Sequence, residues 1–285
     1  MKVGLGLPAS DPASLLGWAR RAEAGPFSTL GLLDRIVYDT PEPMVTLAAI
    51  AGITSRIRVQ TEVLLAPLRA TALLAKQAAT LDRLSDGRFT LGVGVGARED
   101  DYRAVGVDAR SRGRRLNEQM ATLRRVWAGE PYAEDVGPIG PAPVRRGGPE
   151  ILVGGFVPAT VERIARWGDG FLSTRLSPER MDQFSRTIEA SWRAAGRAGH
   201  PRLVAQVNAA LGPEPILDEA RNTLGDYYRS FMGDGAAKVV DEMLGTPEAI
   251  RQAVTAYGDA GADEVMLYCW SSDADQIDRI ADAIP

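Results

Sequence analysis

Residues 54–113 read TSRIRVQTEVLLAPLRATALLAKQAATLDRLSDGRFTLGVGVGAREDDYRAVGVDARSRG, and they carry the clearest structural pattern in the chain. Two apolar segments, residues 58–65 and 88–93, flank a segment whose apolar residues recur at helical spacing. The second apolar segment runs into a glycine-rich turn at residues 92–96. The stretch therefore predicts a strand, a helix and a second strand whose C-terminal end stays open for a ligand.

The same alternation of apolar segments and amphipathic helices continues along the whole chain of 285 residues. Most of the apolar segments are continuous, which is typical of a buried parallel sheet. The pattern predicts a single domain, residues 1–285, built as a closed (β/α)8 barrel; an open doubly wound sheet is the alternative. The eight strands are expected near residues 3–7, 29–33, 57–65, 89–93, 151–153, 170–173, 203–211 and 264–268.

Helices are expected after every strand, and three of them carry a start signal. Asp11, Ser177 and Thr246 each precede a proline, so each is expected to cap a helix. Residues 129–149 are rich in proline and glycine and predict an irregular surface loop, whereas residues 216–244 predict extra helices. The remaining helices are expected near residues 43–54, 70–84, 112–127, 158–167 and 273–284.

Composition argues against several classes of function. The net charge is −4, which gives no indication of a nucleic-acid or anionic-membrane partner. Cys269 is the only cysteine and His200 the only histidine, so we expect no internal disulfide, no histidine-based triad and no metal site built from these residue types. The first residues lack the features of a signal peptide, and no run of 18 apolar residues occurs, so a cytoplasmic protein without a membrane span is expected.

In a (β/α)8 barrel, ligands bind at the C-terminal ends of the strands. The residues at these ends are therefore the candidates for the site. They are Gly6; Asp34 and Arg35; Glu62 and Val63; Gly94, Arg98 and Asp100; Gly154, Gly155, Phe156 and Thr160; Ser173, Thr174 and Arg175; Gln206 and Asn208; and Tyr268 and Trp270.

Two glycine-containing turns among these strand ends predict different contacts. After the fifth strand, Gly154 and Gly155 allow close approach of a ligand, and the helix that follows begins with Pro158. Free amides at a helix start bind anions, so a phosphate is expected there, with an ordinary tight turn as the alternative. Residues 92–96 do not match a dinucleotide-binding fingerprint. Their small residues are expected to lie beneath something flat, such as a cofactor ring.

Asp34 and Glu62 are the two candidate catalytic residues. A carboxylate within an apolar strand either finds a partner or has its pKa raised, so the position of Glu62 is unusual. An ion pair with Arg35 or Arg98 is the structural alternative for Glu62. For Asp34 and Arg35 the alternative is a structural ion pair or a helix cap.

Several segments resemble the luciferase-like monooxygenase family of flavin-dependent oxidoreductases. They are TSRIRV, LLAKQAATLDRLSDGRFTLGVGVGAREDDY, GVDARSRGRRLNEQ, RRVWAGEP and ILVGGFVPATVERIARWGDGF, and together they span most of the chain. The resemblance implies a (β/α)8 barrel that holds a flavin-type ring at its C-terminal mouth. It also implies a phosphate near the turn at Gly154 and Gly155, and a bulge with a non-prolyl cis peptide at Glu62 and Val63, pressed against the ring.

The resemblance further implies an oxidoreductase, with three alternatives for its chemistry. The first is a monooxygenase that uses reduced FMN from a separate flavin reductase and O₂ on a small organic substrate. The second is hydride transfer with the deazaflavin coenzyme F420, and the third is flavin binding without turnover. A sugar-phosphate isomerase rests on the fold alone. A homodimer formed by the helices near residues 43–54 and 70–84 is also expected.

This chain departs from the family pattern at the mouth of the barrel. Members often carry Ser-Asp-His after the second strand, where this chain has Leu33, Asp34 and Arg35. Many members also have a histidine near the end of the eighth strand, where this chain has Tyr268. Proton transfer in this protein is therefore expected to use carboxylates, tyrosine, water or the cofactor itself.

Overall fold

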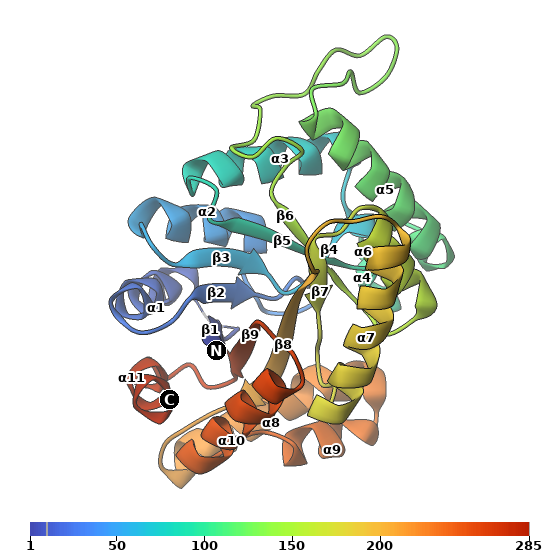
Figure 1. The fold of residues 1–285 in the computed structure, drawn as a ribbon. Helices are drawn as coiled ribbons and strands as arrows, with labels where there is room; N and C mark the ends of the chain where they lie inside the picture. Colours follow the sequence, from blue (N-terminus) through green and yellow to red (C-terminus); the bar gives the residue numbers. More distant parts are fainter. Residues whose placement is uncertain (10, 285) are drawn as a thin grey trace.

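A single parallel sheet forms the centre of the molecule in the computed structural model, which describes residues 1–9 and 11–284. The sheet closes on itself, because β9 pairs with β1 and because β3 and β4 both pair with β5. Figure 1 shows the helices surrounding it. The strands are β1 (Lys2–Gly6), β2 (Thr29–Leu32), β3 (Arg58–Thr61), β4 (Leu64–Leu65), β5 (Phe89–Gly94), β6 (Glu150–Gly154), β7 (Gly170–Leu172), β8 (Arg202–Ala209) and β9 (Glu264–Cys269).

The predicted (β/α)8 barrel is confirmed, and one of its strands is interrupted. The sequence predicts one strand over residues 57–65, whereas the structure has β3 and β4 with Glu62 and Val63 between them. The Glu62–Val63 peptide bond is cis, as the family resemblance implies. Both halves pair with β5, through Val59 opposite Phe89 and Leu64 opposite Val93, so the barrel stays closed across the break.

The helices follow the predicted order, with differences at their ends. Asp11, Ser177 and Thr246 each accept a hydrogen bond from the amide three residues later, so the three predicted caps are confirmed. One six-residue helix, α4, is too short to show a helical period in the sequence. The helices are α1 (Pro12–Ala24), α2 (Pro43–Ile53), α3 (Thr71–Leu84), α4 (Glu99–Ala104), α5 (Arg112–Trp127), α6 (Pro158–Arg166), α7 (Pro178–Ala194), α8 (Glu214–Met232), α9 (Gly235–Asp241), α10 (Pro247–Asp259) and α11 (Gln276–Ala283), with short 3₁₀ turns at Ala66–Leu68 and Ala109–Ser111.

Residues 129–149 form the predicted irregular loop, which extends away from the barrel between α5 and β6 in Figure 1. The predicted extra helices are α8 and α9, and they follow β8. Among the described residues, no helix is both long enough and apolar enough to cross a membrane.

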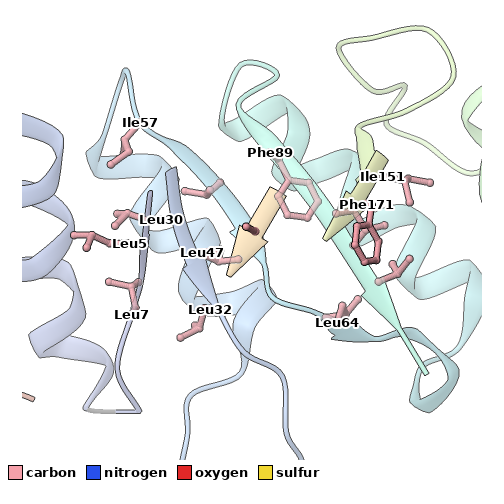
Figure 2. Packing of buried hydrophobic residues seen from close by; sticks show 14 of the residues in the cluster. Leu5, Leu7, Leu30, Leu32, Leu47, Ile57, Leu64, Phe89, Ile151 and Phe171 are labelled. Atoms are coloured by element: carbon pink, nitrogen blue, oxygen red, sulfur yellow. The ribbon is translucent and has the colours of Figure 1, made fainter. Parts of the chain in front are cut away.

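The hydrophobic core has two layers, because successive side chains of a strand point to opposite faces. The outer layer lies between the strands and the helices; Figure 2 shows Leu5, Leu30 and Ile57 in this layer. The inner layer fills the middle of the barrel with Leu152, Leu172, Val204 and Met266, against which Val63 packs. The barrel is therefore filled by side chains up to the level at which β3 breaks.

Polar side chains close the opposite, N-terminal end of the barrel. Arg202 forms ion pairs with Glu150 and with Glu264, and Arg58 contacts Glu150 at 2.9 Å. All four are the first residues of their strands, β8, β6, β9 and β3. In (β/α)8 barrels this end contributes stability and the other end carries the chemistry, so this network is structural.

Glycines on β1 and β2 make room for large side chains inside the barrel. A Cβ at Gly6 would lie 2.0 Å from the ring of Tyr268, and a Cβ at Gly31 would lie 2.3 Å from the carboxyl carbon of Glu62. Gly6 and Gly31 are register partners on adjacent strands. The ring of Tyr268 and the carboxyl group of Glu62 therefore lie over neighbouring positions of the same face of the sheet.

Candidate active site

A cavity of about 450 Å³ opens at the C-terminal mouth of the barrel. Ligand sites commonly have volumes of about 300–1,000 Å³, so this cavity has the size of a binding site for a small molecule. Its walls come from the ends of β2, β3, β7, β8 and β9, from the segment after β6 and from α8. The residues that define it include Leu33, Asp34, Arg35, Glu62, Val63, Gly96, Arg98, Phe156, Arg175, Arg180, Gln206, Tyr227, Tyr228, Phe231, Tyr268 and Trp270.

Glu62 lies in the floor of this cavity and is 5% exposed. Its Oε1 accepts a hydrogen bond of 2.8 Å from the side-chain amide of Gln60, and its Oε2 has no hydrogen-bond partner among the described residues. The alternative of an ion pair with Arg35 or Arg98 is wrong, because both arginines bind aspartates instead. Burial without a cation raises the pKa of Glu62 to about 8, so the group is largely protonated at neutral pH.

Asp34 anchors the broken third strand. Its carboxylate accepts a hydrogen bond from the amide of Leu65 at 2.8 Å and forms an ion pair with Arg69 at 2.8 Å. Burial raises the pKa of Asp34, and the charge of Arg69 opposes this shift. Asp34 therefore touches the cavity while its carboxylate oxygens hold the segment that follows the cis peptide. This supports a positioning role, with Arg69 rather than Arg35 as the ion-pair partner.

Arg35 and the loop that follows β2 are held by Asp101. Arg35 Nε lies 2.8 Å from the carboxylate of Asp101, which also accepts hydrogen bonds from the amides of Ile36 and Val37. Asp101 is fully buried in α4, the helix that the sequence pattern did not show. The neighbouring Asp100, which the sequence suggested for cofactor binding, does not line the cavity. Its carboxylate pairs with Arg98.

An aromatic wall, formed by Tyr227, Tyr228, Phe231 and Trp270, covers one side of the cavity. The Tyr227 ring centroid lies 5.1 Å from that of Trp270, and the indole of Trp270 donates a hydrogen bond of 2.7 Å to Asn208. Three of the four rings come from α8, whose contribution the sequence interpretation missed. The i, i+1 and i+4 spacing of these rings on one helix was the available signal.

Four arginines line the cavity, and two of them, Arg35 and Arg98, form ion pairs with aspartates. The other two, Arg175 and Arg180, form no ion pair with a carboxylate in the described part of the chain. The guanidinium of Arg175 lies 5.1 Å from the centroid of Tyr228, and its Nε has no hydrogen-bond partner among the described atoms. Arg175 has a φ of 59°, which is unusual for a residue with a side chain and is often associated with functional sites. These two arginines leave positive charge available to an anionic ligand.

The turn after β6 lies beside these arginines, since Phe156 and Arg180 line the mouth cavity together and also share a smaller neighbouring pocket. Gly155 has a φ of 131°, and a Cβ at this position would lie 2.7 Å from Oγ1 of Thr160. That oxygen is buried and has no hydrogen-bond partner among the described atoms. A glycine is therefore required here by both backbone conformation and space.

The structure brings part of the predicted site together. Asp34, Glu62, Val63 and Phe156 line the cavity. Gly6, Gly94, Asp100, Gly154, Gly155 and Thr160 do not line it.

The expectation that the small residues of β5 lie beneath a cofactor ring needs correction. A Cβ at Gly94 would lie 2.6 Å from Val63, and one at Gly92 would lie 2.1 Å from the carbonyl oxygen of Thr61. Gly154 likewise faces Val63. These glycines therefore accommodate the broken third strand, and Val63 is the residue that reaches the cavity above them.

Within residues 1–9 and 11–284, no group of three or more histidine, cysteine or carboxylate side chains is placed to hold a metal ion. Apart from the carboxylates of Asp34 and Asp101, which are in ion pairs, the cavity offers arginines and polar atoms without a partner. Besides Arg175 Nε, both Oε2 of Glu62 and Oε1 of Gln206 are buried, lack a partner in the described chain and lie at the cavity. Buried polar atoms are normally paired, so this set indicates a ligand with hydrogen-bond donors, acceptors and negative charge.

The family model described as luciferase-like monooxygenase matches residues 2–268. The chain belongs to this family. An uncharacterized protein of Mycobacterium tuberculosis is 35% identical over 187 residues, which cover 63% of this chain and 64% of that protein. The FMNH(2)-dependent dimethylsulfone monooxygenase of Pseudomonas fluorescens is 29% identical over 222 residues, covering 74% of this chain and 54% of that protein. The matches thus span between about half and two thirds of these relatives.

Solved structures confirm the fold. The monooxygenase RslO1 of Streptomyces bottropensis superimposes with a TM-score of 0.82 at 22% identity, covering 99% of this chain and 98% of that one. An F420-dependent secondary alcohol dehydrogenase, in complex with an F420–acetone adduct, superimposes with a TM-score of 0.80 at 18% identity, covering 100% and 99% of the two chains. At these identities the likeness establishes the luciferase-like barrel, and the cofactor has to be argued from this chain's own residues.

Proposed function

We propose that this protein is a flavin-dependent oxidoreductase that binds FMN at the C-terminal mouth of its barrel. The observation that carries the proposal is the pairing of a cavity of suitable size with two arginines, Arg175 and Arg180, that have no carboxylate partner in the described chain. The start of α6 follows shortly after Phe156, which lines the cavity together with both arginines. A phosphate on the cofactor would use these groups.

The arginines favour FMN over the deazaflavin coenzyme. The long acidic tail of F420 calls for a basic rim, for which the sequence offers Arg35, Arg69 and Arg98. Each of these side chains is already paired, with Asp101, Asp34 and Asp100 respectively. The remaining two cations suit one phosphate group better than a tail with several negative charges.

Different residues of the cavity would bind the phosphate and the ring of such a cofactor. Arg175 and Arg180 would bind its phosphate, while Glu62 and Val63 at the floor and the aromatic wall at the side would enclose its ring. Reduced flavin would supply electrons and, with O₂, the oxygen atom for a small organic substrate. The dimethylsulfone relative is named as FMNH2-dependent, and this supports a separate reductase as the source of reduced flavin. The aromatic side chains would exclude water from the reacting atoms.

Removing Arg175 provides the direct test. We expect Arg175→Ala to weaken FMN binding about 10–100-fold, because a charge-assisted hydrogen bond contributes about 1.5–3 kcal/mol. Arg180→Ala should have a smaller effect, since Arg180 is exposed. Arg186→Ala on the same helix is the matched control, because Arg186 pairs with Asp182 on the surface and should leave affinity unchanged. Flavin fluorescence titration measures all four proteins.

The same titration separates the alternatives. Binding of F420 in preference to FMN would replace the monooxygenase proposal with hydride transfer. FMN binding without substrate-dependent consumption of O₂, in a screen of organic substrates with reduced FMN, would favour a flavin-binding protein without turnover. An Arg175→Ala variant that binds FMN as tightly as the parent protein would overturn the proposed phosphate site.

We also propose that two copies associate through α2 and α3. Four apolar side chains on these adjacent helices are exposed: Val45 and Ile53 on α2, and Leu73 and Leu84 on α3. Apolar side chains gathered on one face of a protein often mark an interface. We expect a sedimentation mass of twice 30.6 kDa at micromolar concentration, and a shift towards the monomer in the double variant Leu73→Lys/Leu84→Lys. A mass of 30.6 kDa for the parent protein would contradict the proposal.

A further inference from the structure

The side chains of Glu62 and Tyr268 both line the floor of the cavity, and each carries a hydroxyl group when Glu62 is protonated. Gly6 is the register partner of both Gly31 and Tyr268, and Gly31 is the glycine over which the Glu62 carboxyl group lies. The carboxyl group of Glu62 therefore lies over β2 and the ring of Tyr268 over the adjacent strand β1. Both line the same cavity, and they are 5% and 1% exposed.

Each side chain already accepts one hydrogen bond and keeps hydrogen-bonding capacity for a ligand. Tyr268 accepts a hydrogen bond of 2.9 Å from the amide of Leu33, which leaves its own O–H free to donate. Glu62 accepts from Gln60 through Oε1, and Oε2 has no partner among the described residues. No hydrogen bond joins the two hydroxyl groups to each other in the described structure, so both remain available to a third atom.

We propose that Glu62, as a carboxylic acid, and Tyr268 together donate hydrogen bonds to one neutral carbonyl group of a bound ligand. Such a pair, a tyrosine and a protonated carboxylic acid in an apolar site, is an established arrangement for holding an oxygen on which negative charge develops. The inference deepens the proposed function, on which it rests, by naming the chemical group that is recognised: the neutral carbonyl of a ketone or a similar compound. The carbonyl group belongs either to the substrate or to the ring of the cofactor.

The surroundings keep both groups in their neutral forms. Burial raises the pKa of Tyr268 well above its ordinary value, and the nearby Glu62 adds to this shift. Two charged groups from the N-terminal end of the barrel act on Glu62: Glu264 raises its pKa and Arg202 lowers it. Asp34 and Arg35 line the same cavity, where Asp34 forms an ion pair with Arg69 and Arg35 forms one with Asp101. None of these side chains forms an ion pair with Glu62 in the described structure, so a carboxylate there would lack a counterion.

The test uses the purified chain of 285 residues, with acetophenone as one probe and FMN as the other. Affinity and the infrared stretch of the probe carbonyl are measured between about pH 6 and pH 9.5. We expect acetophenone to bind the parent protein with a lowered carbonyl frequency, and its affinity to fall about tenfold per pH unit above about 8, where Glu62 ionises. An ionised carboxylate accepts hydrogen bonds and would repel the carbonyl oxygen.

Two variants separate the donors. Glu62→Gln keeps a donor at this position, so its affinity should be retained and become independent of pH. Tyr268→Phe removes a donor, and we expect an affinity about 3–10-fold lower at all pH values together with a higher carbonyl frequency. Tyr257→Phe is the control, because the hydroxyl group of Tyr257 bonds to the carbonyl of Leu176 and does not line the cavity.

The two probes distinguish the source of the carbonyl group. If only acetophenone follows this pattern, the donor pair serves the substrate; if only FMN follows it, the pair holds the ring of the cofactor. If neither probe shows the pH dependence or the response to Tyr268→Phe, the inference is overturned. The proposed function has its own readout in the dependence of FMN affinity on Arg175, which lies outside the donor pair, so the two proposals fail separately.

Discussion

Replacement of Arg202 by methionine is expected to lower the free energy of unfolding by about 3–5 kcal/mol. Arg202 lies inside the N-terminal end of the barrel, where it pairs with Glu150 and Glu264. Glu150 keeps Arg58 as a second partner at 2.9 Å, whereas Glu264, which is fully buried, would keep only the hydroxyl group of Ser28 among the described residues. A buried carboxylate without a counterion is costly, and this cost dominates the effect.

Urea unfolding of the parent protein and the variant measures this change. Arg193→Met is the matched control, because Arg193 is exposed on α7 and lies 3.9 Å from Glu189; a change of about 0–0.5 kcal/mol is expected. The double variant Arg202→Met/Glu264→Met should regain much of the loss, since no uncompensated charge remains. If Arg202→Met lowers the free energy of unfolding by less than about 1 kcal/mol, water or a rearrangement stabilises the unpaired charge of Glu264.

The barrel was predictable from sequence because each of its elements carries a local signal. The caps at Asp11, Ser177 and Thr246 depend on residues at most three positions apart, and the strands depend on runs of apolar residues. Such signals can be recognised in the sequence without knowledge of the tertiary structure. The short helix α4 was missed because six residues do not show a period.

The contacts of the site depend on closure of the barrel, and sequence patterns do not specify them. Arg35 could pair with the adjacent Asp34 or with an aspartate far away in the chain. In the structure its ion-pair partner is Asp101, 66 positions later. The glycines at positions 6 and 31 look like ordinary strand residues until the register shows that they lie beneath Tyr268 and Glu62. The aromatic wall was missed for the same reason, because nothing local places α8 over the mouth.

The resemblance to the family predicted the backbone of the site better than its side chains. It correctly placed the cis peptide at Glu62 and Val63, a feature of the main chain. The histidines that many members carry are replaced by Arg35 and Tyr268 here, and these two residues have acquired different partners, Asp101 and Leu33. The pH dependence of this mouth therefore follows from its carboxyl groups, tyrosines and arginines.

Glu62→Gln is expected to change the pH dependence of stability. In the folded protein the pKa of Glu62 is raised from 4.5 to about 8, so between these values the folded chain holds a proton that the unfolded chain releases. The contribution of Glu62 to the free energy of unfolding is fully present below about pH 4.5 and is lost as the pH rises towards 8. The loss amounts to about 1.4 kcal/mol per pH unit, with an upper limit of about 4–5 kcal/mol.

A glutamine at position 62 can keep the hydrogen bond with Gln60 and carries no titrating proton. Stability of the variant relative to the parent protein should therefore rise steadily from about pH 5 to pH 8 in urea unfolding, then level off. Glu118→Gln on α5 is the control, since Glu118 is exposed and its variant should follow the parent curve. A constant difference between Glu62→Gln and the parent across this range would mean that the buried carboxyl group is ionised throughout. It would then need a counterion that the described cavity does not provide, and the neutral donor proposed for the site would be lost with it.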